Sequence, residues 1–240
     1  MAPPDAEALS TMLRDGSVRM VTLAPEMPGA PELIQATIGR SVVSIGHSDA
    51  SFEVARRAFD QGARSATHLF NAMSSFHHRD PGLPRAALAD SRCTCGIIAD
   101  GWHVYPEVIK VVFAVLGADR IYLVTDAIAA AGMRGGEYSL AGHRVFLEEG
   151  TPLLEDGTMA GSVLQMDEAL RNVLNFTGCT LPEAVRMVAT TPARLIGEGK
   201  RKGRLAPGYD ADVIALTPDL RVDSVWIRGK RVLEGSGGGR

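Results

Sequence analysis

The strongest constraint on the fold of this chain is an alternation of short apolar runs with helical segments. Apolar runs of strand length occur at 18–26, 41–48, 65–70, 95–101 and 121–127. Each is a continuous run rather than a strict alternation of apolar and polar residues, which is typical of strands that are covered on both faces. Strands that alternate with helices predict an α/β fold with a parallel sheet.

Two of the connecting segments carry clear helix start and stop signals. FEVARRAFDQG is helical in pattern and stops at Gly62, and PEVIKVVFAVLG begins at Pro106 and stops at Gly117. The pattern changes after residue 126, where glycine turns and short alternating runs over 137–160 predict a small β excursion. Short strands are expected again in the last segment, from residue 203.

Two further helices are expected after the excursion. Ser162-x-x-Gln165 precedes MDEALRNVLNF, and Thr180-x-x-Glu183 precedes AVRMVA. Both four-residue patterns have the form of a capping box, in which the first side chain bonds the backbone at the helix start. We therefore expect Ser162 and Thr180 to begin helices.

The composition excludes several functional classes. The 240 residues are 45% hydrophobic and 22% charged, which is an ordinary globular composition. A net charge of −3 gives no electrostatic argument for binding nucleic acid, and no apolar run is long enough to span a membrane. The first residues lack the basic-then-apolar order of a signal peptide, so we expect a cytoplasmic protein. The three cysteines, Cys93, Cys95 and Cys179, are expected to be free.

Polar side chains follow the predicted strands at the points where the strands end. In chain order they are Glu26, His47, His68, Asp100 with His103, and Asp126. The carboxyl ends of parallel strands share one edge of the sheet, where the active sites of β/α folds lie. Two histidines and at least one aspartate on this edge favour a catalytic or metal site over separate core residues.

His47 and His68 are the candidate metal ligands, because neutral imidazoles bind Zn²⁺ and similar divalent ions. Two histidines are fewer than the three protein ligands that a catalytic zinc site usually has. Asp126 is either the third ligand or the base that deprotonates a water molecule. The alternative for Asp126 is a structural role as the cap of a following helix.

The segment FNAMSSFHHRDPG has features of an anion site. Asn71 and the backbone N–H groups after it are a candidate anion cradle, and Arg79 carries a guanidinium suited to phosphate or carboxylate. The alternative for Arg79 is a solvated side chain on a surface loop. His103 is a candidate substrate contact or a packed loop histidine, and no role is assigned to His77, His78 or His143.

Eight short motifs give the sequence a specific resemblance when they are taken in order. They are TLAPE (22–26), GHSDA (46–50), THLFNAM (67–73), R-D-PG (79–82), IIADGWHV (97–104), LVTDA (123–127), MAGSVLQMD (159–167) and GRLAPGYDADVIAL (203–216). This ordered set resembles the N-acetylglucosamine-6-phosphate deacetylases of the amidohydrolase superfamily. The resemblance covers nearly the whole chain.

The resemblance implies a β/α barrel with a small β-sandwich, and hydrolysis of N-acetylglucosamine 6-phosphate to glucosamine 6-phosphate and acetate. It implies that His47 and His68 bind one divalent metal ion (Zn, Fe, Mn or Co) and that Asp126 is the catalytic aspartate. The implied substrate contacts are Asn71, Ala72, Arg79, His103, Met159, Ala160 and Gly161. Arg79 typically reaches a phosphate in the neighbouring subunit's site, which implies a homodimer.

The same resemblance implies the domain organisation. We expect a partial β/α (TIM-type) barrel of about the last five strands over 1–200, with the β excursion at about 137–160. Residues 201–234 are expected to form the C-terminal strands of the small sandwich, and residues 235–240 a flexible tail.

The sequence also departs from this family. The family's upstream H-x-E-G-P motif, whose glutamate binds the metal, is not found in the 240 residues. A closed barrel needs eight strands, so we expect an N-terminally shortened deacetylase with an open sheet, exposed apolar interior side chains and little activity alone. The alternatives are an inactive remnant that binds sugar phosphate or a partner chain, and a different amidohydrolase such as a cyclic amide hydrolase. Asn71 and Arg79 argue against the last of these.

Overall fold

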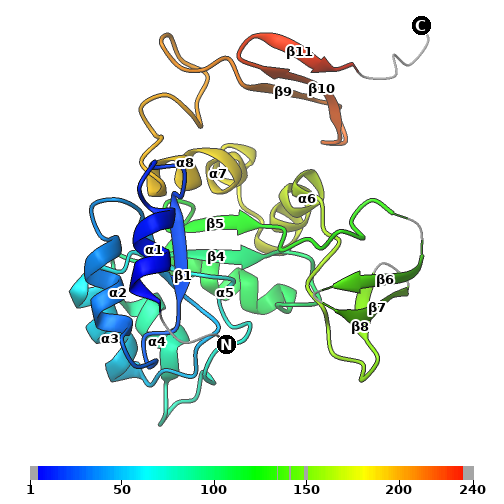
Figure 1. The fold of residues 1–240 in the computed structure, drawn as a ribbon. Helices are drawn as coiled ribbons and strands as arrows, with labels where there is room; N and C mark the ends of the chain where they lie inside the picture. Colours follow the sequence, from blue (N-terminus) through cyan, green and yellow to red (C-terminus); the bar gives the residue numbers. More distant parts are fainter. Residues whose placement is uncertain (1–4, 134, 141, 149–150, 235–240) are drawn as a thin grey trace, which may run out of the picture.

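The computed structural model describes residues 5–133, 135–140, 142–148 and 151–234, and it confirms the predicted parallel sheet (Figure 1). Five strands pair in chain order, β1-β2-β3-β4-β5, and every pair is parallel. They are β1 (Met20–Leu23), β2 (Val42–Ile45), β3 (Ser65–Ala66), β4 (Thr94–Ile98) and β5 (Ile121–Val124). Each strand is shorter than its predicted run, because the last residues of each run turn out of the sheet.

Helices precede and connect these strands. They are α1 (Ala6–Met12), α2 (Ala30–Thr37), α3 (Phe52–Gln61), α4 (Gly82–Ala89) and α5 (Pro106–Leu116). The predicted ends of α3 and α5 are confirmed, since Gly62 and Gly117 follow them with φ of 124° and 62°. Glycine adopts such angles without steric cost. Among helices in the described ranges, none has the length and apolarity of a membrane span.

The apolar core lies between these helices and one face of the sheet. The residues of this face are register partners along neighbouring strands: Val43, Ile45, Ala66, Cys95, Ile97, Ile121 and Leu123. They are buried in one cluster with helix residues such as Ile34, Phe59 and Leu83. Cys93 and Cys95 are buried free thiols and Cys179 is a partly buried one, as predicted. Burial of this face is the main source of stability for the sheet.

The opposite face of the sheet carries hydroxyl groups, so the expected apolar interior face is wrong at these positions. Thr22, Ser44 and Ser65 are register partners on this face. The hydroxyl of Thr67 lies 2.6 Å from that of Ser44 and 3.0 Å from that of Thr22. Because these side chains satisfy one another, the face does not need an apolar layer to cover it.

Tyr122 fills the same face further along the sheet. Its hydroxyl lies 3.0 Å from the Ser65 hydroxyl, and burial raises the pKa of Tyr122 to about 12. A Cβ at Gly96 would approach the Tyr122 ring to 2.9 Å. Glycine at position 96 therefore makes room for the tyrosine.

The second half of the chain contains two antiparallel sheets and further helices, as predicted. The first sheet consists of β6 (Gly136–Leu140), β7 (His143–Glu148) and β8 (Thr151–Leu154), and it extends to one side of the parallel sheet in Figure 1. The second consists of β9 (Val213–Leu216), β10 (Val222–Ile227) and β11 (Lys230–Leu233). The predicted flexible tail at 235–240 lies outside the described residues.

The helices between the two sheets test the two capping-box predictions. They are α6 (Met166–Thr177), α7 (Leu181–Val185), a π-helical turn η1 (Arg186–Thr190) and α8 (Thr191–Leu195). Thr180 and Glu183 form the predicted capping box of α7. The prediction for Ser162 is wrong, because α6 begins after Gln165 without a side-chain cap.

Candidate active site

Four of the five parallel strands are followed, two residues beyond their last residue, by a polar side chain at the carboxyl edge of the sheet. These residues are His47 after β2, His68 after β3, Asp100 after β4 and Asp126 after β5. The carboxyl edge is where active sites of β/α folds are built.

The imidazoles of His47 and His68 converge. Their Nε2 atoms lie 2.9 Å apart and their rings meet edge to face. His68 is 5% exposed, and its Nδ1 is buried without a hydrogen-bond partner among the described residues. Burial and then the neighbouring His47 lower the pKa of His68, which favours the neutral ring. Neutral nitrogens directed at one point are suited to a divalent metal ion.

Asp126 is close enough to His68 for its charge to act on that ring, where it opposes the lowering of the pKa by burial and His47. Its backbone carbonyl accepts the N–H of Ser162 at 2.9 Å, and the carbonyl of Ser162 accepts the N–H of Ile128 at 2.9 Å. The Ser162 hydroxyl donates to the Thr125 carbonyl. These bonds explain why Ser162 does not cap α6. No helix begins within described residues 127–133, so the capping alternative for Asp126 is wrong.

The backbone at all three residues is left-handed. The φ angles of His47, His68 and Asp126 are 48°, 30° and 49°. This conformation costs roughly 1–2 kcal/mol for a residue with a Cβ. Strained residues of this kind cluster at functional sites, where the surrounding structure holds them in place.

Glu26 anchors the loop that follows His47. Its carboxylate accepts a hydrogen bond from the Ser48 hydroxyl at 2.7 Å and from the Asp49 N–H at 2.8 Å. Ser48 in turn pairs with the loop after β3, donating its N–H to the Ala72 carbonyl at 2.9 Å. Glu26 therefore supports the loop that carries His47.

Asn71 and Ala72 lie in the turn that follows His68. The Asn71 amide donates to the backbone carbonyls of His68 and Leu69, each at 3.3 Å. Ala72 is exposed and has a φ of 47°. The turn thus holds the Asn71 side chain against the backbone of His68, and the substrate contacts of Asn71 and Ala72 stay predictions.

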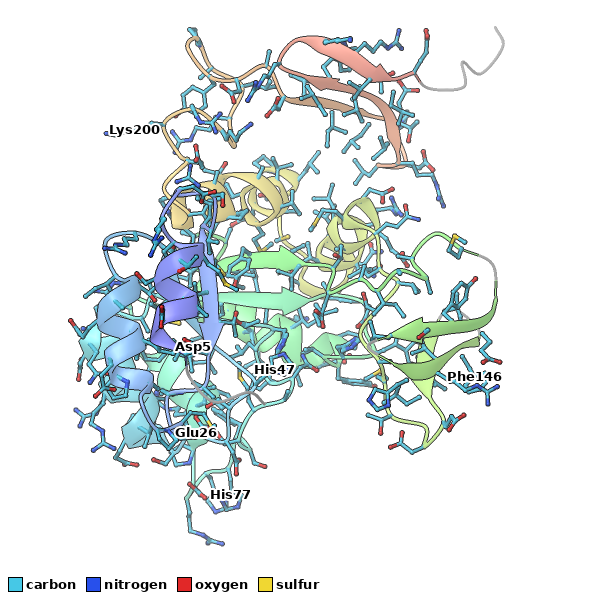
Figure 2. The ribbon with its side chains drawn as sticks, in the orientation of Figure 1. Asp5, Glu26, His47, His77, Phe146 and Lys200 are labelled. Atoms are coloured by element: carbon cyan, nitrogen blue, oxygen red, sulfur yellow. The ribbon has the colours of Figure 1, made fainter. Side chains whose placement is uncertain are left out.

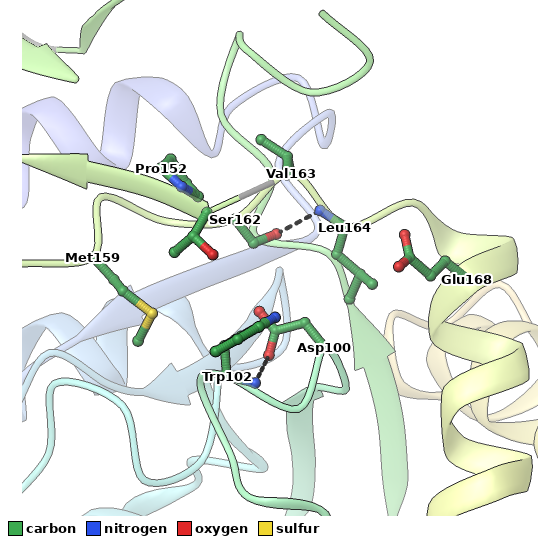
Figure 3. A pocket seen from close by; sticks show the side chains of 9 residues that line it. Asp100, Trp102, Pro152, Met159, Ser162, Val163, Leu164 and Glu168 are labelled. Carbon is green, nitrogen blue, oxygen red and sulfur yellow. Dashed lines mark hydrogen bonds between the residues drawn. The ribbon is translucent and has the colours of Figure 1, made fainter. Parts of the chain in front are cut away.

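Met159 and the turn that carries His103 meet at a small cavity of about 60 Å³ (Figure 3). Asp100 and Trp102 line one side, and Met159 and Ser162 line the other. Neither His47 nor His68 lines this cavity.

Ala160 and Gly161 connect Met159 to the segment beside Asp126. The Ala160 N–H donates to the Pro152 carbonyl at 2.9 Å. Gly161 has a φ of 79°, and a Cβ there would lie 2.8 Å from the Ile128 side chain. Only glycine fits at this close approach, so Gly161 supports the backbone around Asp126.

Arg79 lies apart from the other predicted site residues. It is exposed, and its guanidinium makes no hydrogen bond or ion pair to the described residues. His77, two residues before it, lies at the end of a loop that projects away from His47 (Figure 2). The structure therefore does not bring Arg79 to the histidine pair of its own chain.

The described residues bring no third ligand-type side chain to the histidine pair. Within the part of the chain that the structure describes, no three His, Cys, Asp or Glu side chains are grouped closely enough to hold one metal ion. His47 and His68 are therefore two ligands of a candidate metal site.

Comparison with known proteins decides the family. The model of the amidohydrolase family matches residues 9–232. The chain belongs to the amidohydrolase family. A curated relative, N-acetylgalactosamine-6-phosphate deacetylase of Escherichia coli O157:H7, is 41% identical over 215 residues, which are 89% of this chain and 57% of the relative. N-acetylglucosamine-6-phosphate deacetylase of Lysinibacillus sphaericus is 40% identical over 220 residues, which are 90% of this chain and 57% of the relative.

A solved structure extends this similarity to the fold of the amidohydrolase chain. A mutant of the N-acetyl-D-glucosamine-6-phosphate deacetylase from Mycobacterium smegmatis, in complex with N-acetyl-D-glucosamine-6-phosphate, matches with a TM-score of 0.92 and 36% identity. The match covers 97% of this chain and 63% of that chain. The amidohydrolase chain thus spans between half and two thirds of the length of these deacetylases, and its fold is a partial barrel of the same kind.

Sequence reasoning gave no individual role at the site to two residues that shape it. Ser162 is one: it was predicted to begin a helix, and its partners Thr125 and Asp126 lie more than thirty residues away, so no local signal marks them. Asp100 is the other. The sequence Asp-Gly-Trp-His contains its signal, since an aspartate followed by glycine favours a turn in which the carboxylate bonds the next backbone N–H groups.

Proposed function

We propose that this amidohydrolase removes the acetyl group of N-acetylglucosamine 6-phosphate, giving glucosamine 6-phosphate and acetate. The observation that carries the proposal is the convergence of the His47 and His68 Nε2 atoms, which lie 2.9 Å apart, with the charge of Asp126 acting on the His68 ring. The relatives support the substrate class, since their names give the 6-phosphates of both N-acetylglucosamine and N-acetylgalactosamine. A phosphorylated sugar also supports the cytoplasm as the location.

The residues present fit a divalent metal ion, which His47 and His68 would hold through their Nε2 atoms. The low pKa of the buried His68 supports this role, because only a neutral imidazole nitrogen can bind a metal. When bound, a Zn, Fe, Mn or Co ion lowers the pKa of water toward neutrality and polarises the acetyl carbonyl.

Asp126 moves the proton in this proposal. Its carboxylate takes a proton from the attacking water and returns it to the sugar nitrogen, so that the nitrogen leaves as an amine when the C–N bond breaks. The hydrogen bonds that Ser162 donates to the carbonyls of Thr125 and Asp126, and accepts from the N–H of Ile128, hold the backbone on both sides of this carboxylate. Met159 offers an apolar contact to the acetyl methyl group, and His103, Asn71, Ala72, Ala160 and Gly161 surround the sugar phosphate.

The partner in this proposal is a second copy of the chain, with Arg79 serving the neighbouring copy's site. Two features support this role: the exposed guanidinium of Arg79 has no partner among the described residues, and its loop projects away from its own histidine pair. A guanidinium binds phosphate through two parallel hydrogen bonds. The homodimer would thus complete each phosphate site.

A second candidate function is binding of the sugar phosphate without hydrolysis. The favouring observation is that two histidines, and no third ligand among the described residues, approach one point. A weakly held metal ion would leave the binding residues intact and remove the chemistry.

Acetate release and metal content separate the two candidates. The full 240-residue chain is incubated with zinc, manganese or iron and with either N-acetylhexosamine 6-phosphate. Acetate release supports the deacetylase, whereas binding of the sugar phosphate without acetate supports the second candidate.

Metal analysis of His47→Ala and His68→Ala tests the ligands. We expect both variants to lose the specifically bound metal, and His143→Ala, at the exposed first position of strand β7, to retain it. Undiminished metal content in the first two variants would show that the assignment of the ligands is wrong.

A further inference from the structure

We propose that Asp100 is a positioning residue, which fixes the tautomer and orientation of His103 so that its Nε2 accepts a hydrogen bond from a hydroxyl group of the sugar phosphate. The identity of the ligand rests on the proposed function. The geometry of the pair comes from the structure alone.

The Asp100 carboxylate holds both the ring and the backbone of the turn. Oδ2 lies 2.6 Å from the Nδ1 of His103, and Oδ1 accepts the N–H groups of Trp102 and His103, each at 2.9 Å. The side chains are 11% exposed for Asp100 and 8% for His103. Three hydrogen bonds on one largely buried carboxylate leave the imidazole little freedom to rotate.

The charge of Asp100 decides which nitrogen of the ring carries the proton. Burial acts to raise the pKa of Asp100, but the hydrogen bonds from the His103 ring and from the backbone of His103 and Trp102 outweigh it, and the pKa is lowered. An ionised carboxylate can only accept a hydrogen bond. Nδ1 of His103 must therefore be the donor, and Nε2 of the neutral ring is left with a lone pair.

The free nitrogen is available to a ligand. Nε2 makes no hydrogen bond to the described residues, and it is not among their buried polar atoms that lack a partner, so solvent reaches it. The same turn presents Trp102 to the cavity opposite Met159, and Figure 3 shows the Asp100 carboxylate bonded to the Trp102 backbone at that cavity. An acceptor at this place suits the hydroxyl groups of a sugar.

The turn is fixed to the body of the protein independently of Asp100. The Ala99 carbonyl accepts the side-chain amide of Asn172 from α6 at 2.9 Å. Gly101 has a φ of 83°, which glycine adopts without strain. A substitution that keeps a side-chain oxygen at position 100, able to accept the backbone N–H groups, should therefore leave the turn folded. It should change only the tautomer of the His103 ring.

Asp100→Asn is such a substitution. The amide oxygen can still accept the backbone N–H groups, while the amide nitrogen faces Nδ1 of His103 as a donor. The ring must then carry its proton on Nε2, the opposite tautomer. We expect two-bond ¹H–¹⁵N spectra at about pH 9, above the ordinary imidazole pKa of about 6.5, to show the switch. The affinity for N-acetylglucosamine 6-phosphate should fall about tenfold.

Asp90→Asn is the matched control. The Asp90 side chain is 12% exposed, accepts the N–H of Arg92 two residues on at 2.9 Å, and bonds the side chain of that residue. We expect this variant to leave the His103 spectrum and the sugar-phosphate affinity unchanged. His103→Gln gives a second test, because adding Asp100→Asn to it should cause no further loss of affinity.

The outcomes separate this inference from the proposed function. A wild-type ring protonated on Nε2, an unchanged tautomer in Asp100→Asn, or additive losses in the double variant would overturn the role of Asp100. A wild-type chain that neither binds the sugar phosphate nor releases acetate would overturn the proposed function and the ligand named here. The tautomer comparison would still decide whether Asp100 positions His103.

Discussion

The two ends of the parallel sheet use polar side chains differently: those at one end bond the backbone, and those at the other converge at the candidate site. At the amino-terminal end, Arg120 and Arg64 donate to backbone carbonyls. Arg120 bonds four of them at 2.6–3.3 Å, and Arg64 bonds two at 2.7 and 3.1 Å. At the carboxyl end, His47, His68 and Asp126 have left-handed backbones, and the Nδ1 of His68 has no hydrogen-bond partner among the described residues.

The difference teaches which end serves stability and which serves chemistry. Arginines that satisfy buried carbonyls remove a cost of folding. Strained residues and an unpaired imidazole nitrogen add to that cost, and they persist where the side chains are needed for another purpose. In β/α folds this division of the two ends is general. Substitutions at the two ends should therefore have opposite signatures.

Asp126→Asn should give the largest effect, and it should lower the rate of acetate release without changing stability. In a form of the protein that releases acetate, we expect the rate to fall by ~10²–10⁴-fold, because the proposed general base is lost, while substrate binding and the urea midpoint stay nearly unchanged. Asp156→Asn, in the exposed turn after β8, is the control and should keep the full rate. Near-wild-type turnover in Asp126→Asn would exclude this residue as the base.

Arg120→Ala should give the converse result. Losing the donor to the carbonyls of Ala87, Leu88, Asp90 and Cys93 should lower the free energy of unfolding by about 3 kcal/mol, measured in urea, without lowering the metal content of the folded chain. Arg92→Ala is the control, since the Arg92 side chain is 43% exposed and its ion pairs with Asp60 and Asp90 are open to solvent on the arginine side, so that they should contribute below ~1 kcal/mol. Equal losses in the two variants would remove the distinction between the ends.

Arg79→Ala tests whether the carboxyl side also holds the phosphate. We expect the affinity for the sugar phosphate to weaken by roughly 1.5–3 kcal/mol, the contribution of a charged hydrogen bond, and the affinity for the unphosphorylated sugar to stay the same. Titration calorimetry with both sugars measures this, and Arg85→Ala, at an exposed position of the otherwise largely buried α4, should change neither affinity. Parallel losses for the two sugars would argue against a phosphate role.

Tyr122→Phe probes the face between the two ends and should have the smallest effect. Losing the bond to Ser65 should cost about 1 kcal/mol near pH 7. The raised pKa means that the folded protein holds the phenol proton more tightly than the unfolded chain does. This stabilisation is complete below about pH 10 and is lost as the pH rises toward 12. The difference in the free energy of unfolding between the two proteins should therefore be smaller at pH 11 than at pH 9. An equal difference at the two pH values would contradict the assignment.

The order and type of the main elements could be predicted from the sequence because hydrophobic period and helix stop signals are local. The five strands, α3, α5 and the two antiparallel sheets follow from such signals. The lengths of the strands could not, since residues such as His68 read as strand but turn out of the sheet with a positive φ. That turn depends on the loop that packs beside it.

The residues of the candidate site could be predicted from the sequence, but the hydrogen bonds that connect its segments could not. The positions of His47, His68 and Asp126 at strand ends follow from the pattern alone, whereas their roles still rest on proposals. Ser162 looked like a helix cap because its neighbours in sequence fit a capping box. Its true partners, Thr125 and Asp126, are more than thirty residues away, and only the folded chain brings them together.

The left-handed backbone of His47, His68 and Asp126 also affects how such a sequence is expected to change during evolution. Glycine occupies this conformation without the contact between Cβ and the following carbonyl, so replacing any of the three would relieve steric strain while discarding a functional group. Glycine at any of the three positions would therefore give a less strained chain that, under the proposed function, is inert. Selection for the reaction is what opposes that replacement. In a lineage released from such selection, these three side chains should disappear before the apolar face of the sheet changes.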